Sequence, residues 1–361
     1  MSRNRRPLIR LAAAVLVVSV LAACGGGSAS SDTSSADGTN AAVPGQGDGV
    51  NYPLTGLPIE DKAAAARPAL AIKIDNHPTA RPQTGLNKAD IVFEENVEAL
   101  TRFAAVFHSE GSDPVGPIRS GRTQDINILG SFNKPLFGWS GGNYRVTRAI
   151  NDSDLVNVGY SASRGKGGYY RAKDKKAPYN LFAKTTNLWT LAPKDAVPPQ
   201  PQFTYRGSSD AKPATSTAVD GAKVSMYNVK VYWKWDVTTG NFIRFGENLK
   251  RELEPHMADD GQVNTKNVLV LYVTYTRSKA DRKSPNAITT GKGTGFVLTD
   301  GGLIPINWVR ADRLVPFTIT DASGAVVRMT PGRTWVELAW KNSLAPVAPG
   351  IDPKTVKFPA V

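Results

Sequence analysis

The stretch that decides the fold reads Ala89-Asp90-Ile91-Val92-Phe93-Glu94-Glu95-Asn96-Val97-Glu98, and the segment from Leu100 to His108 follows it after one residue. Both segments are short and rich in β-branched and aromatic residues, which predicts two antiparallel strands joined by a tight turn. The surrounding region, Asp75 to Arg122, holds the densest set of charged residues among apolar ones. We therefore treat the rest of the chain as its scaffold.

The two faces of this hairpin are expected to differ, because successive side chains of a strand point to opposite sides. Glu94, Asn96 and Glu98 then share one face. Apolar side chains fill the other face: Phe93, Val97, Phe103 and Phe107. The alternation predicts one buried face and one solvated, acidic face.

A candidate anion site follows the hairpin. Gly116-Pro117 indicates a turn, and Ser120 is a candidate N-cap for a helix over Asp125 to Phe132. A helix start flanked by Arg119 and Arg122 would suit an anion, because free N–H groups and guanidinium groups both bind oxygens. The alternative is that the two arginines pair internally with a carboxylate of this region: Asp75, Glu94 or Glu98.

More candidate ligand-binding residues lie at the end of a predicted buried strand, Ala69 to Asn76. In an open α/β sheet, ligands bind beyond the carboxyl ends of the strands, which makes Asp75 and Asn76 candidates. The alternative is that both side chains cap a turn. Arg102, next to Glu98 across the hairpin turn, and Arg81 complete the set.

This region resembles the YerB-like bacterial lipoproteins. The resemblance is carried by Asp75-Asn76, Ala80 to Leu86, Ala89-Asp90-Ile91, Glu94, Glu98, Thr101-Arg102-Phe103 and Gly116 to Arg122, and it continues more thinly to about residue 340. Ile118 and Gly121 stand where the family pattern leads us to expect Val and Ala. The resemblance implies an amino-terminal and a carboxy-terminal domain of unknown function and an envelope location, and it implies no chemistry.

The first 23 residues have the layout of a signal peptide. Four arginines precede an apolar run from Leu11 to Ala23, which is too short for a permanent membrane helix. Leu21-Ala22-Ala23-Cys24 resembles a lipobox, which implies that Cys24 carries palmitate-type acyl chains and anchors the protein at the extracytoplasmic face of the membrane. The alternative is a buried cysteine after an uncleaved anchor. Arg5-Arg6 also resembles a twin-arginine export motif, so the export route stays open.

Composition limits the partners. Cys24 is the only cysteine, which excludes disulfides and thiolate zinc sites. Cleavage would remove four arginines and no acid, so the net charge of +13 would fall to +9. Outside the cell, a basic protein meets anionic envelope polymers and glycans rather than nucleic acid. The oligomeric state is not predicted.

The chain is expected to fold as an α/β (α+β) domain with a mixed sheet, followed by a mostly antiparallel β domain. The predicted boundaries are a lipidated cysteine and disordered tether at 24–50, the first domain at 51–195, a linker at 196–220, the second domain at 221–345 and a tail at 346–361.

A weak nucleophile motif lies in the first domain. Gly138-Trp139-Ser140-Gly141-Gly142 fits G-x-S-x-G and lies between a predicted strand and helix. A serine nucleophile needs a base, and of the three histidines only His256 follows Ser140 in hydrolase order. The alternative is a glycine-rich turn without catalysis.

Two aromatic and basic segments are candidate contact surfaces. The segment 161–180 has six cations and one acid, and Tyr169 and Tyr170 could stack on sugar rings. Tyr232, Trp233 and Trp235 could form a second carbohydrate platform. The alternatives are a solvated surface loop in the first case and core packing in the second.

Metal and cofactor sites are not expected. Glu254-Pro255-His256 with Asp259 and Asp260 is the one His/Asp cluster, and a single imidazole makes a poor zinc site, whereas Asp-Gly favours a turn. No dinucleotide, P-loop or zinc-protease motif is present.

Two hypotheses follow. The first is an accessory lipoprotein that binds an anionic or glycan component of the envelope. The second is an envelope hydrolase or transferase that uses Ser140 as a nucleophile, or Asp75, Glu94 or Glu98 as a general acid or base.

Overall fold

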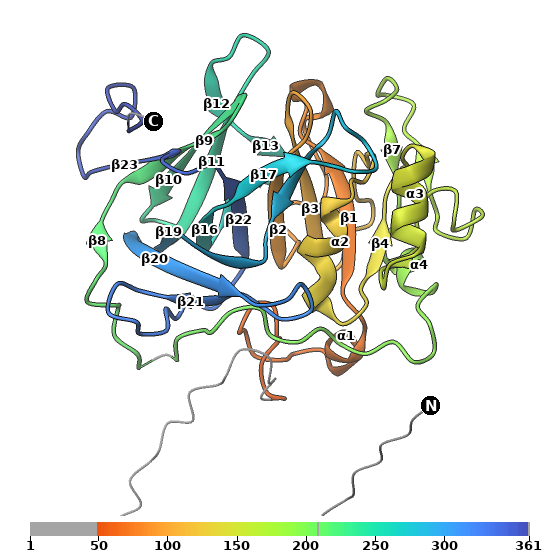
Figure 1. The fold of residues 1–361 in the computed structure, drawn as a ribbon, viewed down its shortest axis with the longest axis horizontal. Coiled ribbons are helices and arrows are strands. Elements are labelled where there is room, and N and C mark those ends of the chain that lie inside the picture. Colours follow the sequence, from red (N-terminus) through yellow and green to blue (C-terminus); the bar gives the residue numbers. More distant parts are fainter. Residues whose placement is uncertain (1–48, 208, 360–361) are drawn as a thin grey trace, which may run out of the picture. The chain divides into compact units, whose positions relative to one another are not determined.

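The computed structural model describes residues 49–207 and 209–359, which lie within one compact unit spanning Ala42–Val361 (Figure 1). The predicted signal peptide, Cys24 and all but the end of the predicted tether lie outside the described residues. Within the two described ranges, no helix is long and apolar enough to cross a bilayer.

The amino-terminal half contributes five strands to an 11-stranded sheet. They are β1 (Leu70–Asp75), β2 (Ile91–Asn96), β3 (Thr101–Phe107), β4 (Leu136–Gly138) and β5 (Val156–Asn157). The predicted hairpin is confirmed, because β2 and β3 pair antiparallel. β1 pairs antiparallel with β3 and parallel with β4, so this part of the sheet is mixed, as predicted.

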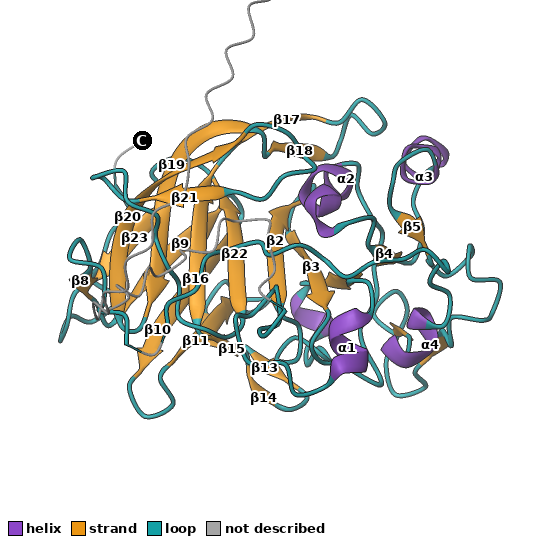
Figure 2. Cartoon of the chain, turned by 90° about the horizontal axis from the view of Figure 1, so that it is seen from below, coloured by secondary structure: helices purple, strands orange, loops and turns teal. Residues whose placement is uncertain are grey.

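The same sheet continues into the carboxy-terminal half. β22 (Thr334–Ala339) lies between β2 and β16 (Asn267–Tyr272), parallel to both. Antiparallel pairs extend the sheet beyond β16 through β19 (Gly291–Thr299), β20 (Gly302–Arg310), β21 (Thr318–Thr320) and β8 (Thr217–Ala218). The two predicted domains therefore share one continuous sheet (Figure 2).

A second, antiparallel sheet of six strands comes entirely from the carboxy-terminal half. Its strands are β9 (Gly221–Met226), β10 (Val229–Asp236), β11 (Asn241–Glu247), β12 (Leu253–Pro255), β15 (Asn264–Thr265) and β23 (Leu344–Val347). Trp233 of β10 meets Trp335 of β22 at a ring distance of 5.3 Å, so this sheet packs against the large one. The mixed amino-terminal and mostly antiparallel carboxy-terminal arrangement confirms the predicted fold class.

Short helices cover the amino-terminal part of the large sheet. They are α1 (Lys62–Ala66), α2 (Gln124–Leu129), α3 (Tyr144–Asn151) and α4 (Thr185–Trp189), with 3-10 turns η1 (Pro78–Ala80) and η2 (Gly130–Phe132). α2 and α3 bury apolar residues in the core on one face, whereas Leu188 of α4 belongs to the core on the other. Three small hairpins lie outside the main sheets: β6 (Tyr170–Arg171) with β7 (Leu181–Phe182), β13 (Met257–Ala258) with β14 (Gly261–Gln262), and β17 (Thr274–Arg277) with β18 (Pro285–Ile288).

The prediction that one face of β2 is exposed to solvent is wrong. All six residues of β2 are buried, because β22 covers its edge and side chains pack on both faces. Phe93 lies in one core, whereas Phe103, opposite Glu94, lies in the other. Apolar residues on both faces of a hairpin fit an interior strand of a sheet with two covered faces.

The segment predicted as a linker is anchored to both halves. Asn133 donates to the carbonyl of Pro198 at 2.9 Å, and Ser131 donates to Gln202 at 2.7 Å. Tyr205 forms a bridge with Met329. These contacts hold the crossing segment on the surface of the compact unit.

Candidate functional site

A cavity of about 210 Å³ opens where β1 ends and the β2–β3 turn begins. We call it the arginine groove. Its polar and aromatic lining consists of Asp75, His77, Glu98, Thr101, Arg102, Arg119 and Tyr179. The structure therefore brings together four of the predicted ligand-binding residues, from segments far apart in the sequence.

Asp75 is held in place at the tip of β1. Its main-chain N–H donates to the carbonyl of Pro117 at 3.0 Å, and its Oδ1 accepts from the N–H of His77 at 2.9 Å. Its Oδ2 accepts from Arg119 Nε at 2.6 Å. Asp75 therefore has both of its predicted roles: one carboxylate oxygen caps the turn, and the other binds Arg119 at the groove.

The groove together with Arg122, which binds one of its carboxylates, holds more positive than negative charge. Arg119 is bound to Asp75 through Nε alone, and its terminal nitrogens make no hydrogen bond to the described part of the chain. Arg122 binds Glu98 through Nε at 3.0 Å and Nη2 at 2.7 Å. Arg102 donates to the carbonyl of Ser120 at 2.9 Å and makes no ion pair with a described residue. Arg122 does not line the groove itself, but counted with Arg102 and Arg119 it brings three guanidinium groups to the two carboxylates Asp75 and Glu98.

Arg102 remains charged in this environment. Burial, followed by the nearby charges of Arg122 and Arg119, lowers its pKa to about 10. A guanidinium with that pKa is protonated at neutral pH. The surplus charge is therefore real at physiological pH and faces a cavity that solvent can reach.

The predicted helix N-terminus at Ser120 is wrong. α2 begins at Gln124, and Thr123 stands at its N-cap without a side-chain capping bond. Asp125, in the first turn, accepts from the N–H of Arg122 at 2.7 Å and from buried Lys73 at 2.8 Å. The Asp125 carboxylate therefore occupies the helix start where an external anion was expected. Ser120 takes part only through its carbonyl, which accepts from Arg102, and no described helix N-terminus lies beside the arginines of the groove.

Glu94 does not reach the groove, which corrects its prediction as a ligand or catalytic residue. Its side chain is fully buried and accepts two hydrogen bonds from Arg244 Nη2, at 3.0 and 2.8 Å. Trp335 Nε1 and Thr101 Oγ1 donate to the same carboxylate at 3.3 and 2.7 Å. Glu94 is a structural counter-ion between the two halves of the chain.

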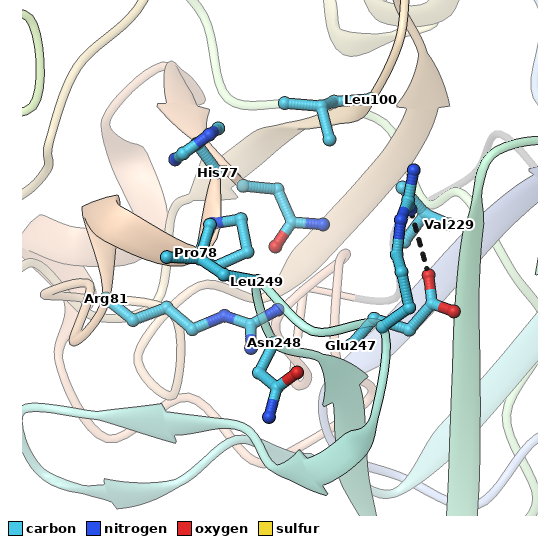
Figure 3. Close-up of a pocket in the computed structure, with 10 residues that line it drawn as sticks. His77, Pro78, Arg81, Leu100, Val229, Glu247, Asn248 and Leu249 are labelled. Carbon is cyan, nitrogen blue, oxygen red and sulfur yellow. Dashed lines mark hydrogen bonds and ion pairs between the residues drawn. The ribbon is translucent and has the colours of Figure 1, made fainter.

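A second cavity, of about 170 Å³, adjoins the groove and shares His77 and Leu100 with it. We call it the Arg81 pocket. Its remaining lining comes from Asn76, Pro78, Arg81, Val229, Glu247, Asn248, Leu249 and Arg251. Figure 3 shows Arg81 reaching past Pro78 toward Asn248, while Glu247 lies at the far side in an ion pair. Asn76 and Arg81 thus belong to a different cavity from Asp75.

Ser140 lies on the predicted turn between β4 and α3, whose N-cap is Asn143. No histidine of the described chain hydrogen-bonds to its hydroxyl. His256 is fully buried, with one ring nitrogen on Arg244 and the other on Gln83 Oε1 at 2.9 Å. His256 therefore follows Ser140 in the sequence as a hydrolase requires, but its ring is bound to Arg244 and Gln83 and cannot serve as the base for Ser140.

Two basic segments flank the arginine groove. The 161–180 segment carries exposed Arg164, Lys166, Arg171, Lys173 and Lys176, and its Tyr179 stacks on His77 at 4.9 Å. Tyr169 is not available for stacking, because its hydroxyl donates to the carbonyl of Val158 at 2.9 Å in the interior, whereas Tyr170 is exposed.

The second basic segment is the tip of the β17–β18 hairpin, residues 277–284, which we call the basic hairpin. Arg277, Lys279, Arg282 and Lys283 are exposed. Ser284 at its end donates to Glu98 at 2.6 Å, which fixes the hairpin beside the groove. This segment was not among the predicted site residues, although four cations against one acid within eight residues are a recognisable sequence signal.

The remaining candidates have structural roles. Trp233 is fully buried and Tyr232 nearly so, which supports the core alternative for the β10 aromatics. Asp259 and Asp260 form the turn between β13 and β14. Among the described residues, no group of three or more His, Cys, Asp or Glu side chains could hold a metal ion.

The chain belongs to a family defined by two domains of unknown function. The Protein of unknown function (DUF3048) N-terminal domain matches residues 54–198, and the DUF3048 C-terminal domain matches residues 204–336. A curated relative, "Putative lipoprotein YerB" of Bacillus subtilis (strain 168), is 27% identical over 325 residues, covering 86% of this chain and 92% of that protein.

The crystal structure of the YerB protein from Bacillus subtilis has the same fold. It aligns with a TM-score of 0.66 at 20% identity, over 86% of this chain and 99% of that chain. The predicted family is confirmed by these matches, and the boundary between the two family domains falls in the segment that crosses between the halves of the sheet.

Proposed function

We propose that this chain is a lipid-anchored protein of the cell envelope that binds an anionic polymer or anionic glycan of that envelope in its arginine groove. Cys24 in its lipobox-like context is the anchor, and the extracytoplasmic face of the membrane is the location. The name of the Bacillus relative, "Putative lipoprotein YerB", supports the anchor.

The observation that carries the binding proposal is the charge balance of an open cavity. Arg102 and Arg119 line the groove with Asp75 and Glu98, and Arg122 binds Glu98 without lining the cavity, so three arginines meet two carboxylates. The 161–180 segment and the basic hairpin add exposed cations on either flank. Arg119 keeps two terminal nitrogens for a ligand, and guanidinium groups bind phosphate and carboxylate oxygens in pairs. A polymer with repeating anions can contact the groove and both flanks together.

Retention on purified envelope polymer tests this proposal. Replacing Lys279, Arg282 and Lys283 by Gln removes three exposed cations without touching a described hydrogen bond of their side chains. At about 0.2–1 kcal/mol per exposed charge, the total of about 1–2 kcal/mol should weaken retention roughly 5–30-fold at 0.1 M salt.

The matched control replaces three other exposed lysines, Lys62, Lys134 and Lys234, by Gln. Lys62 begins α1, which precedes β1, and thus lies near the opposite end of that strand from Asp75. The control has the same net charge as the test variant. Equal losses in both variants would show that only the net charge matters and would overturn the proposed site.

The hydrolase alternative predicts labelling of Ser140 by an active-site serine probe. The buried, fully engaged ring of His256 argues against a serine–histidine pair. The carboxylate version retains Asp75 and Glu98 at the groove, but both are engaged by arginines. We therefore favour binding over catalysis.

A further inference from the structure

The Arg81 pocket contains a cation whose hydrogen-bonding capacity is largely unused. The Arg81 side chain is 11% exposed, and its Nε and Nη1 atoms are shielded from solvent without a hydrogen bond to the described residues. Nη2 is not among these shielded atoms and is therefore the nitrogen that a ligand can reach. The nearest carboxylate oxygen belongs to Glu254, 3.7 Å from Nη1, and that side chain is 47% exposed. The guanidinium group can therefore donate to an oxyanion in the pocket.

Nearby positive charge favours the binding of an anion by Arg81. Arg244 is close enough to lower the pKa of Arg81, after burial, to about 10, so Arg81 stays protonated at neutral pH. Arg244 itself is neutralised by Glu94. Lys175 donates to the carbonyls of Ala80 and Pro82 at 3.2 and 3.1 Å, which fixes the main chain that carries Arg81.

The pocket also offers a hydrogen-bond acceptor of fixed orientation. Asn76 Nδ2 donates to Thr101 Oγ1 at 2.7 Å and to Glu94 Oε1 at 3.2 Å. Because the paired carboxylate of Glu94 can only accept, the amide nitrogen must face Glu94. Asn76 Oδ1 then points away from Glu94. It has no hydrogen-bond partner among the described residues and is shielded from solvent, so a ligand N–H reaches it only when the side chains of the pocket shift to admit the ligand.

The remaining walls favour a small monoanion with an apolar neighbour. Pro78, Leu100, Val229 and Leu249 line the pocket. Glu247 and Arg251 both line the pocket and pair with each other at 3.2 Å, so they add no net charge to it. Arg81 is then the one arginine of the lining without a hydrogen-bonded carboxylate in the described chain, which matches a ligand with a single negative charge. A phosphodiester offers no N–H for Asn76, whereas the last residue of a peptide carries a carboxylate and an N–H on the same carbon.

We propose that the Arg81 pocket binds the carboxyl terminus of a peptide, with the carboxylate on Arg81, the terminal N–H on Asn76 Oδ1 and the terminal side chain against the apolar wall. This inference adds to the proposed function a second site, beside the arginine groove, that is specific for the end of a peptide. It rests on the proposed function in one respect, that the peptide belongs to the cell envelope. The recognition residues Arg81 and Asn76 do not line the groove.

Calorimetric titration of the full chain in detergent micelles tests the proposal with acetyl-alanyl-alanine and its carboxamide. The free acid should bind at least about tenfold more tightly than the amide, because a hydrogen bond to a charged group contributes about 1.5–3 kcal/mol. Arg81→Gln should remove the difference. Arg148→Gln, in an exposed ion pair on α3, should bind as the wild type does.

A rim variant keeps the test valid if Arg81→Gln does not fold. Leu249 is 71% exposed, and Leu249→Asp places a carboxylate at the mouth of the pocket, where it should repel the acid and spare the amide. Equal binding of acid and amide, absence of acid binding at millimolar concentration, or wild-type affinity in both variants would overturn the proposal.

Two further comparisons complete the design. Peptides ending in L- and D-alanine distinguish a protein terminus from a non-ribosomal peptide, and binding of either supports the pocket. Polymer retention measured on the same samples separates the two proposals: peptide binding without retention defeats only the proposed function, and retention without carboxylate binding defeats only the end-group pocket.

Discussion

The replacement Arg244→Met should destabilise the protein strongly, because it leaves Glu94 charged and buried without its counter-ion. Both side chains are fully buried, and two hydrogen bonds join Arg244 Nη2 to the carboxylate. Burial, followed by the charge of Glu94, raises the pKa of neighbouring Glu337 well above its usual range, whereas Arg244 is hydrogen-bonded to Glu94.

The expected loss is about 3–5 kcal/mol, which is typical when one partner of a buried ion pair is removed. For a unit of this length, with an unfolding entropy of about 2.1 cal/mol/K per residue, that loss corresponds to a fall of about 5–8 °C in the thermal midpoint. Glu94→Gln combined with Arg244→Met removes both charges and should recover about 2 kcal/mol relative to the single variant.

Differential scanning calorimetry and urea titration measure these changes. The matched control is Arg148→Met, which breaks an ion pair with Asp152 whose side chains are 68% and 67% exposed, and it should cost less than about 1 kcal/mol. If Arg244→Met lowers the midpoint no more than Arg148→Met, or if the double variant is less stable than Arg244→Met, Glu94 is not held as a buried ion by Arg244.

Three more predictions concern other parts of the chain. Burial raises the pKa of Asp90 to about 6, above its ordinary 3.8. This carboxyl therefore stabilises the fold fully below pH 3.8 and loses that contribution as pH rises through 6. About 2 kcal/mol should be lost between pH 4 and 7, and Asp90→Asn should flatten that fall in pH-dependent urea unfolding. Gly221→Ala should cost more than about 1 kcal/mol in the same assay, because a Cβ would lie 2.0 Å from the carbonyl oxygen of Trp233 and the φ angle is +152°; an unchanged midpoint would refute the close approach. Ser140→Ala should leave polymer retention unchanged, and labelling of the wild type but not of Ser140→Ala by a serine-directed phosphonate would revive the hydrolase hypothesis.

Local patterns predicted the elements well. The β2–β3 hairpin, the buried strand that ends at Asp75 and the strand–turn–helix around Ser140 were all readable, because alternation, Asx residues and glycine-rich turns act over a few residues. The position of Asp75 at a strand end correctly indicated a cavity, since strand ends are where side chains from several elements meet.

Contacts between distant segments could not be predicted in this way. Glu94 was expected in solvent, but β22 pairs with β2 and brings Trp335 onto the same carboxylate from 241 residues away. Ser120 matched the local rule for an N-cap, yet Lys73 of β1 and Asp125 fix where α2 begins. The Arg81 pocket depends on the end of β11 and the turn that follows it lying beside η1, for which the sequence carries no short-range signal.

The charge surplus of the arginine groove is the central claim, and Arg119 tests it most directly because its terminal nitrogens are free of described hydrogen bonds while its Nε binds Asp75. The decisive measurement is the affinity of the full chain for a soluble polyol-phosphate polymer, made with the wild type and with Arg119→Gln. The salt concentration is varied from about 0.05 to about 0.5 M, because charge screening changes strongly over that range. The proposed function predicts that wild-type affinity falls steeply with salt and that Arg119→Gln binds about fivefold more weakly with a shallower salt dependence. Wild-type affinity and slope in Arg119→Gln, or binding that does not respond to salt, would contradict it.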